Sequence, residues 1–324
     1  MKAAMYTQYG SPDVIRLLEV DIPTPREDEV LVRVKAASLN AFDWHMLRAK
    51  PFVVRLMGGG LMKPKVQVLG ADLAGTVESV GSAVQQLKPG DEVFGEITSS
   101  GTGAFAEYAC AREKYLARMP AGMTFEEAAA LPMAGMTALQ GLRDIGKIQA
   151  GQKVLIQGAS GGVGSYAVQI ARAYGAHVTA VCSTAKVELM RELGADEVID
   201  YTKEDFTQGE QRYDLILAAN GYHSLADYKR ALTDQGIYVM AGGNNAQLFQ
   251  AVLLGSFYSE KEGKKMAAFT AATRQEDLQA LKELVEAGKV KSVIDRSYPL
   301  NQVAEAMRYL EEGHARGKIV LTMG

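Results

Sequence analysis

The chain has 324 residues, of which 48% are hydrophobic and 23% charged, and its formal net charge at pH 7 is −3. This length exceeds what one hydrophobic core usually serves, so we expect two domains. The small negative charge argues against binding to nucleic acid or anionic membranes, and no uninterrupted apolar run is long enough to span a bilayer. The cysteines are Cys110 and Cys182 alone, and the first residues lack the apolar core of a signal peptide. We therefore expect a cytoplasmic protein without disulfide bonds.

The predicted elements change in character along the chain. Up to about residue 120 the pattern is β-rich, because residues 30–36 alternate and residues 75–81 and 91–95 are short runs bounded by turn residues. From about residue 121 to 258 strands and helices alternate, which predicts a parallel sheet. The expected strands are 153–157, 177–182, 197–200, 213–218 and 236–241, and the expected helices are 165–174, 185–193 and 224–232. Helices over 276–287 and 303–312 then precede a closing strand at 318–321.

A glycine-rich turn follows the predicted strand 153–157. It runs from Gly158 to Gly164 and leads into the predicted helix 165–174. Glycine allows a sharp turn and a close approach to a pyrophosphate, and the helix start offers N–H groups to the anion. The order strand, turn and helix predicts a dinucleotide site that includes Ser160, Gly161, Gly162 and Val163. The alternative is a tight turn that only packs the helix on the strand.

The residues after the second strand bear on the choice of coenzyme. An NAD site usually has an acid about 20 residues after the glycines, to hold the ribose 2′-hydroxyl. Here that place holds Ser183 and Thr184, followed by Lys186, and no acid comes before Glu188. Hydroxyls and a lysine suit a 2′-phosphate, so we expect NADP(H). The alternative for Lys186 is a solvated lysine at a helix start.

Several segments together resemble a known family. They include residues 37–44, 69–77, 87–93, 129–138, 158–164 and 313–318. The chain resembles, over nearly its whole length, the zinc-free medium-chain dehydrogenases/reductases of the NADPH:quinone oxidoreductase and enone reductase kind. The resemblance implies an α/β fold, in which a Rossmann domain with a doubly wound parallel sheet is inserted into a GroES-like β-barrel domain. We expect the GroES-like catalytic domain at 1–120 and 265–324, the NADP-binding Rossmann domain at 121–264, and a homodimer.

The related zinc alcohol dehydrogenases hold their catalytic ion with Cys and with His or Glu. The corresponding segments here read Leu39-Asn40-Ala41-Phe42-Asp43 and Gly70-Ala71-Asp72, with no thiolate or imidazole at the required place. An unorthodox site made by Asp43, His45 and Asp72 is the alternative. We expect no metal, and without a Lewis acid the oxidation of an alcohol is disfavoured.

The expected activity is therefore NADPH-dependent hydride transfer to quinones or α,β-unsaturated carbonyls, which are small electrophilic substrates. The family motif implies that Asn40 lies beside the nicotinamide. Asp43 and His45 are further catalytic candidates, with His45 or a water returning the proton. The alternatives are a turn-forming asparagine and a plain surface histidine. A second hypothesis is a non-catalytic NADPH-binding sensor or interaction protein on the same fold.

The resemblance also implies other contacts with the coenzyme. Thr137 matches a position near the nicotinamide carboxamide, with a helix N-cap as the alternative. Tyr201 matches a tyrosine along the adenosine ribose and its 2′-phosphate, with a strand-end tyrosine as the alternative. Lys318 either reaches the coenzyme or is an ordinary strand-edge lysine, and we favour the latter. Where the strand 236–241 ends, the residues expected near the nicotinamide are Gly242, Gly243 and Asn244.

Overall fold

The computed structural model describes residues 1–324 except 53, 56–59, 66, 101–102 and 244–262. The chain divides into two compact units, which are described separately below. Among the described residues, no helix has both the length and the apolar character needed to cross a membrane.

The first unit comprises Met1–Met133, Thr273–Glu286 and Ser292–Gly324. Its main sheet has the strand order β14-β15-β3-β4-β5-β7, and β6 also pairs with β3. Its strands are β1 (Lys2–Met5), β2 (Arg16–Glu19), β3 (Glu29–Ser38), β4 (Asp72–Val80), β5 (Glu92–Glu96), β6 (Tyr108–Arg112), β7 (Leu116–Arg118), β14 (Ile294–Pro299) and β15 (Lys318–Thr322). Its helices are α1 (Ala41–Arg48), α2 (Phe125–Ala130), α8 (Gln275–Glu286) and α9 (Val303–Glu311).

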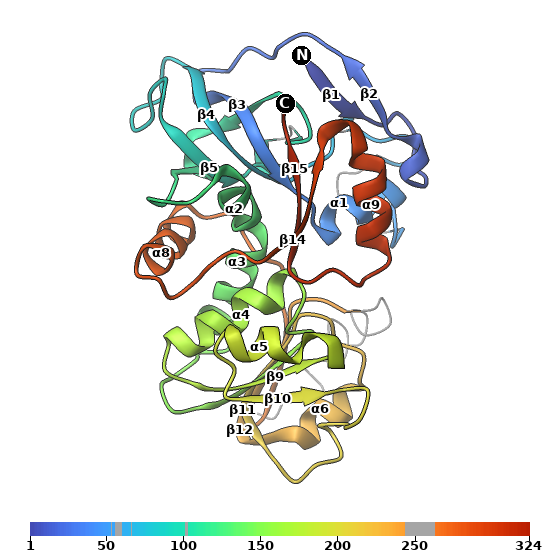
Figure 1. The fold of residues 1–324 in the computed structure, drawn as a ribbon, viewed down its shortest axis with the longest axis vertical. Coiled ribbons are helices and arrows are strands. Elements are labelled where there is room, and N and C mark those ends of the chain that lie inside the picture. Colours follow the sequence, from blue (N-terminus) through green and yellow to red (C-terminus); the bar gives the residue numbers. More distant parts are fainter. Residues whose placement is uncertain (53, 56–59, 66, 101–102, 244–262) are drawn as a thin grey trace. The chain divides into compact units, whose positions relative to one another are not determined.

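Pairing between distant segments builds this sheet. The last strand, β15, runs antiparallel to β3, with Val320 opposite Ser38, and Figure 1 shows β15 beside β3. β3 also pairs with β4, and β4 pairs with β5. Alternate side chains of these strands, such as Val32, Val34 and Leu73, are buried in one apolar core. The C-terminal segment therefore completes a sheet that begins near the N-terminus.

The second unit comprises Ala134–Ala272 and Ala287–Lys291. Its sheet is parallel at every pairing and has the order β10-β9-β8-β11-β12-β13. Its strands are β8 (Lys153–Gln157), β9 (His177–Cys182), β10 (Glu197–Asp200), β11 (Tyr213–Ala218), β12 (Leu232–Met240) and β13 (Lys265–Ala268). Its helices are α3 (Pro132–Gln140, whose first two residues fall in the first unit), α4 (Gly162–Ala173), α5 (Val187–Glu192) and α6 (Leu225–Ala231). The predicted parallel sheet and α/β class are confirmed.

The order of strands fixes where ligands can bind in this sheet. From β8 the chain moves outward to β9 and β10, and then returns to the other side of β8 with β11. In an open α/β sheet, ligands bind at the carboxyl ends of the strands where the order reverses in this way. Gly158, which follows β8, lies at that point, and α4 packs against β8 and β9.

The borders of the two units differ from the predicted residues 120 and 265. Residues 121–133 belong to the first unit, because α2 packs against β3 and β4. Residues 265–272 belong to the second unit, since β13 pairs with β12. Neither packing partner can be read from local sequence patterns.

Candidate functional site

Two positions of the glycine-rich turn favour glycine, one because of its backbone conformation and the other because a Cβ would clash. Gly158 has φ +73°, in the left-handed region. A Cβ at Gly164 would lie 2.1 Å from the carbonyl oxygen of Gly158 and 2.6 Å from Cα of Ala159. This close packing brings the start of α4 against the end of β8, as the sequence predicts.

The middle of the turn differs from its ends. Among the described residues, a Cβ at Gly161 would have the Gly158 oxygen, 3.5 Å away, as its only neighbour within 4 Å. Gly161 is the N-cap of α4 and provides no side-chain cap, so N–H groups of the first helical turn, around Gly162 and Val163, are available to an anion. The neighbouring Ser160 is buried. The turn therefore fits a diphosphate group.

Ser183, Thr184 and Lys186 lie directly after β9. Ser183 caps a short 3-10 helix that spans Thr184–Lys186. Thr184 is exposed, while Ser183 and Lys186 are half-buried. The structure thus brings the three predicted residues together at the carboxyl end of β9, beside the glycine-rich turn that ends β8.

A carboxylate also lies at this corner, which corrects one interpretation made from the sequence. Asp200 ends β10 and is opposite Cys182 in the parallel register. The hydroxyl of Thr184 donates to Oδ2 of Asp200 at 2.5 Å. Counting along the chain from the glycines can find only an acid that directly follows β9, whereas Asp200 comes from the end of the adjacent strand β10. The expectation of a corner without an acid is therefore wrong.

Three further residues predicted to contact the coenzyme lie in the second unit. Tyr201 is 51% exposed and makes an edge contact with Tyr222, with ring centroids 6.3 Å apart. Thr137 is the sixth residue of α3, so the alternative that it caps a helix is wrong. Gly242 follows β12, and a Cβ there would lie 2.4 Å from the Ala219 oxygen.

Gly243, the next residue, bridges to Gly221 after β11, while the predicted Asn244 lies outside the described residues. The bridge between Gly221 and Gly243 thus joins the carboxyl ends of β11 and β12. The glycine-rich turn lies at the same edge of the sheet.

In the first unit, a buried polar network surrounds Asn40. Lys318 Nζ donates to Asn40 Oδ1 at 2.5 Å and to the Leu39 carbonyl at 3.0 Å. Asn40 Nδ2 in turn donates to Asp72 Oδ2 at 2.9 Å. Ser38 donates its hydroxyl to the same carboxylate oxygen at 3.0 Å. The amide of Asn40 is thus held in one orientation by a donor on one side and an acceptor on the other.

The strand register explains why these polar groups meet. Ser38 is opposite Asp72, and Asp72 is opposite Glu96, so the three lie in a row across β3, β4 and β5. Lys318, at the start of β15, is 3% exposed and its Nζ lies 3.7 Å from Asp72. It is therefore neither a strand-edge lysine nor a surface residue, contrary to the favoured expectation.

Burial dominates the electrostatics of this network. It raises the pKa of Asp72, although the Lys318 ammonium and the donors from Asn40, Met133 and Ser38 oppose the rise. Burial also raises the pKa of Glu96 to about 7, with a further contribution from the nearby charge of Asp72. A carboxyl group that stays protonated near neutral pH avoids the cost of a buried negative charge.

The contacts of Asp43 anchor the backbone on both sides of its side chain, and its predicted catalytic role stays a prediction. It is fully buried and accepts the backbone N–H groups of Asn40 at 2.8 Å and Gly70 at 3.0 Å. Burial raises its pKa to about 7, and these two backbone donors and Lys318 act in the opposite direction. Asp43 thereby ties the first turn of α1 to the segment that precedes β4.

His45, the third catalytic candidate, lies on α1 and is half-buried. Its Nδ1 lies 2.6 Å from the Lys50 carbonyl oxygen, so Nδ1 is the nitrogen that donates in this contact. No hydrogen bond of the described residues links it to the Asn40 network. The structure therefore joins Asn40 and Asp43 but leaves His45 outside their network.

The residues of this region do not fit a zinc ion. Asn40 and Asp72 lie in the segments that correspond to those of the zinc ligands. The ammonium of Lys318 lies 2.5 Å from Asn40 Oδ1 and 3.7 Å from Asp72 Oδ2. Zinc in proteins takes thiolate, imidazole and carboxylate ligands, usually four of them in total. Within the described ranges, no group of three or more His, Cys, Asp or Glu side chains could hold a metal. The ammonium of Lys318 is already paired with the carboxyl group of Asp72.

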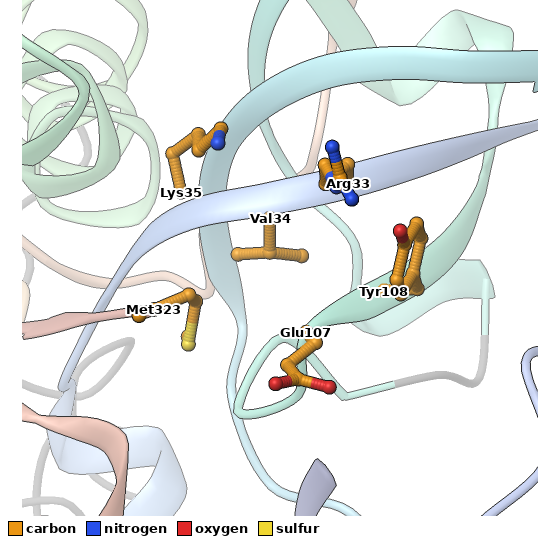
Figure 2. A pocket seen from close by; sticks show the side chains of 7 residues that line it. Arg33, Val34, Lys35, Glu107, Tyr108 and Met323 are labelled. Atoms are coloured by element: carbon orange, nitrogen blue, oxygen red, sulfur yellow. The ribbon is translucent and has the colours of Figure 1, made fainter. Parts of the chain in front are cut away.

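A separate hollow on the first unit carries none of the predicted site residues. Figure 2 shows this cavity of about 330 Å³, and the residues that line it are Arg33, Val34, Lys35, Glu107, Tyr108, Met323 and Gly324. Glu107 is already engaged there, since it accepts the backbone N–H of Lys2 at 2.7 Å. We assign no role to it.

Comparison with known proteins connects both units to one family. Residues 26–121 match the model of the alcohol dehydrogenase GroES-like domain, and residues 193–321 match a model described as zinc-binding dehydrogenase. The chain is 38% identical over 332 residues to 2-methylene-furan-3-one reductase of Solanum lycopersicum, covering 99% of this chain and 79% of the relative. It belongs to the quinone oxidoreductase and alkenal/one reductase family.

Two further members of the family are similar over the whole chain. NADPH-dependent alkenal/one oxidoreductase, chloroplastic, of Arabidopsis thaliana is 37% identical, with 99% of this chain and 79% of the relative covered. The structure of the quinone oxidoreductase from Coxiella burnetii has a TM-score of 0.86 and 29% identity, with 99% of each chain covered. The family belongs to the medium-chain dehydrogenases/reductases, and the expected GroES-like and Rossmann-like architecture is confirmed.

Two contacts of the candidate site are not predicted by the sequence. Asp200 was missed because its neighbour Thr184 is 16 residues away along the chain. The pairing of Lys318 with Asn40 spans 278 residues. A signal for the first exists, since adjacent parallel strands end side by side and Asp200 ends the next predicted strand. We see no comparable local signal for the second.

Proposed function

We propose that the chain is an NADPH-dependent reductase that transfers hydride to quinones or α,β-unsaturated carbonyls without a metal. The observation that carries the proposal is the backbone at Gly161, the N-cap of α4, where a Cβ would meet only one atom of the described residues within 4 Å. Among those residues, no side chain lies in the way of a diphosphate that approaches the main chain at Gly161. The named activities of the similar proteins give the substrate class.

The division of labour in such a reaction supports this substrate class. When it is bound, the nicotinamide supplies the hydride, and the protein contributes position and electrostatics. Electron-poor C=C bonds and quinones accept hydride with little further activation. The first unit provides a rigid polar network rather than a metal, because Lys318 and Asp43 fix the Leu39–Asn40 turn by hydrogen bonds.

The roles proposed for single residues follow from these contacts. Asn40 is proposed to position the reacting groups, since its amide is held by Lys318 and Asp72. Asp43 is proposed to support that position through its bonds to the backbone of Asn40 and Gly70. His45 stays a prediction as a proton donor, and its half-exposed ring agrees with exchange with solvent.

NADPH is the proposed coenzyme. Ser183 and Lys186 supply a hydroxyl and a positive charge at the end of β9, and a 2′-phosphate needs such groups. The exposed Tyr201 ring lies after the adjacent strand β10 and offers a surface for the adenosine. One similar protein is named NADPH-dependent. The homodimeric state and the cytoplasmic localisation remain predictions.

Steady-state assays of the purified chain test this function. We expect oxidation of NADPH with a panel of 1,4-quinones, 2-alkenals and enones, and none with saturated carbonyls. Coenzyme binding is measured in parallel by the fluorescence of the reduced nicotinamide. Binding without turnover on the whole panel would overturn the reductase and favour a non-catalytic NADPH-binding protein. Absence of binding would overturn both.

A further inference from the structure

The corner formed by Ser183, Thr184 and Lys186 includes one group that the proposed function does not explain. Asp200 uses both of its carboxylate oxygens within the protein. Oδ1 accepts the backbone N–H of Thr202 at 3.0 Å and its hydroxyl at 2.7 Å. Oδ2 accepts the hydroxyl of Thr184 at 2.5 Å, and Lys203 Nζ lies 3.3 Å from it. These contacts fix the carboxylate in place.

The direction of the hydrogen bond determines what Thr184 can offer a ligand. A hydroxyl has one proton, and Thr184 gives its proton to Asp200. Its remaining lone pairs can accept a hydrogen bond but cannot donate one to a phosphate oxygen. A ribose 2′-hydroxyl is a donor, and it therefore suits Thr184 in this state. A 2′-phosphate offers acceptors and does not.

The charge of Asp200 acts in the same direction. The hydroxyls of Thr184 and Thr202 hold its pKa well below the usual range, so the group is a carboxylate at neutral pH. A 2′-phosphate carries about two negative charges, and a fixed carboxylate at the same corner would repel it. Lys203 offsets part of this charge, but its side chain is 69% exposed and the pair is screened by solvent.

We propose that Asp200 is a specificity-determining residue that limits the preference of this chain for NADPH over NADH. The inference rests on the proposed function, because it concerns the same coenzyme site. Lys186 and Ser183 favour the phosphate, while Asp200 and the Thr184 hydroxyl that it orients favour the free ribose hydroxyl. The wild-type chain therefore accepts both coenzymes, with NADPH bound more tightly.

The Asp200→Asn variant tests the inference directly. Asparagine at this place carries no negative charge. Its Nδ2 group can donate to the oxygen of Thr184, and the hydroxyl proton of Thr184 is then free to be donated to a phosphate oxygen. The measured quantity is the ratio of the dissociation constants for NADH and NADPH, from fluorescence titration at neutral pH. We expect this ratio to rise about tenfold in favour of NADPH. General damage to the fold would weaken the binding of both coenzymes equally, so it could not produce this rise in the ratio of dissociation constants.

The chain offers a matched control in Asp205→Asn. Asp205 accepts the backbone N–H and the hydroxyl of Thr207 at 2.9 and 2.8 Å, which is the same local turn that Asp200 makes with Thr202. No hydrogen bond joins Asp205 to Thr184 in the described part of the chain. We expect the ratio of the dissociation constants for NADH and NADPH to be the same in Asp205→Asn as in the wild type.

A second variant changes the same balance in the opposite direction. Lys203→Met removes the ammonium beside Asp200, which leaves the carboxylate unopposed. We expect the ratio to fall about threefold, toward NADH. An unchanged ratio in Asp200→Asn, with both coenzymes bound, would overturn the role of Asp200 and leave the proposed function intact. A wild-type chain that binds neither coenzyme would overturn the proposed function, and the inference with it.

Discussion

The ammonium of Lys318 lies 2.5 Å from the side-chain oxygen of Asn40, although the two residues are 278 positions apart. The last strand delivers the lysine to the turn that follows β3, because β15 pairs antiparallel with β3. Both side chains are buried, at 3% and 8% exposure. The first unit thus holds a buried positive charge against the turn that follows β3.

Lys318→Met is expected to destabilise the protein by about 3–5 kcal/mol, because it leaves the carboxylate of Asp72 buried without its cation. The double variant Lys318→Met with Asp72→Asn should cost less than the sum of the single changes, since it removes both charges. Urea denaturation provides the free energies of unfolding. The control is Lys35→Met, on the exposed side of β3, with an effect within about 0.5 kcal/mol. Equal effects of Lys318→Met and the control would contradict the buried pair.

Glu96→Gln is expected to change the pH dependence of stability. Burial raises the folded-state pKa of Glu96 from 4.5 to about 7, so the folded protein holds this proton more tightly than the unfolded chain. Stability should therefore fall as the pH rises from about 4.5 to about 7, by about 3 kcal/mol at most from this group. Glutamine cannot ionise, and the variant should gain stability over the wild type between pH 5 and pH 8. A constant difference across that range would exclude the buried carboxyl as the source.

Two glycines of the turn should respond differently to alanine. Gly164→Ala places a Cβ 2.1 Å from a backbone oxygen, and we expect losses in both thermal stability and NADPH affinity. The Cβ of Gly161→Ala meets no atom of the described residues closer than 3.5 Å, so stability should change by less than about 1 kcal/mol. Its methyl group would occupy the approach of the diphosphate, and affinity should fall about tenfold or more.

Gly209→Ala serves as the control for this pair, because its nearest neighbour is 3.8 Å away. We expect wild-type stability and wild-type affinity for NADPH. If Gly161→Ala binds NADPH as tightly as Gly209→Ala does, the turn is only a packing feature and the alternative considered from the sequence is correct.

Metal content gives an independent check. The ammonium of Lys318 and the absence of suitable ligand groups in the described residues predict less than stoichiometric zinc in the purified protein. Treatment with a chelator should leave reductase activity unchanged. One tightly held zinc per chain, removed together with the activity, would contradict the metal-free proposal.

Much of the second unit could be predicted from the sequence. The predicted strands 153–157, 177–182, 197–200 and 213–218 coincide with β8, β9, β10 and β11. Their central residues form continuous buried apolar runs, such as Val154–Ile156, which is typical of a parallel sheet covered on both faces. β12 begins at Leu232 rather than 236, because pairing with β11 continues before Gly236. Local patterns are sufficient where burial is continuous.

The candidate site was less predictable because its contacts come from different strands. Asp200 meets Thr184 only through the register of β9 and β10. Lys318 meets Asn40 only because β15 pairs with β3. The sequence identifies residue types that can bind a coenzyme, but it does not show which of their protons are already donated to other groups of the protein.

The most direct test of the central claim follows the hydride itself. The purified chain is given an enone substrate and NADPH that carries deuterium at the transferable position of the nicotinamide. The account predicts one NADPH oxidised per saturated carbonyl formed, with deuterium at the β-carbon of the product. NADPH bound at the site without any transfer of deuterium to enones or quinones would contradict it.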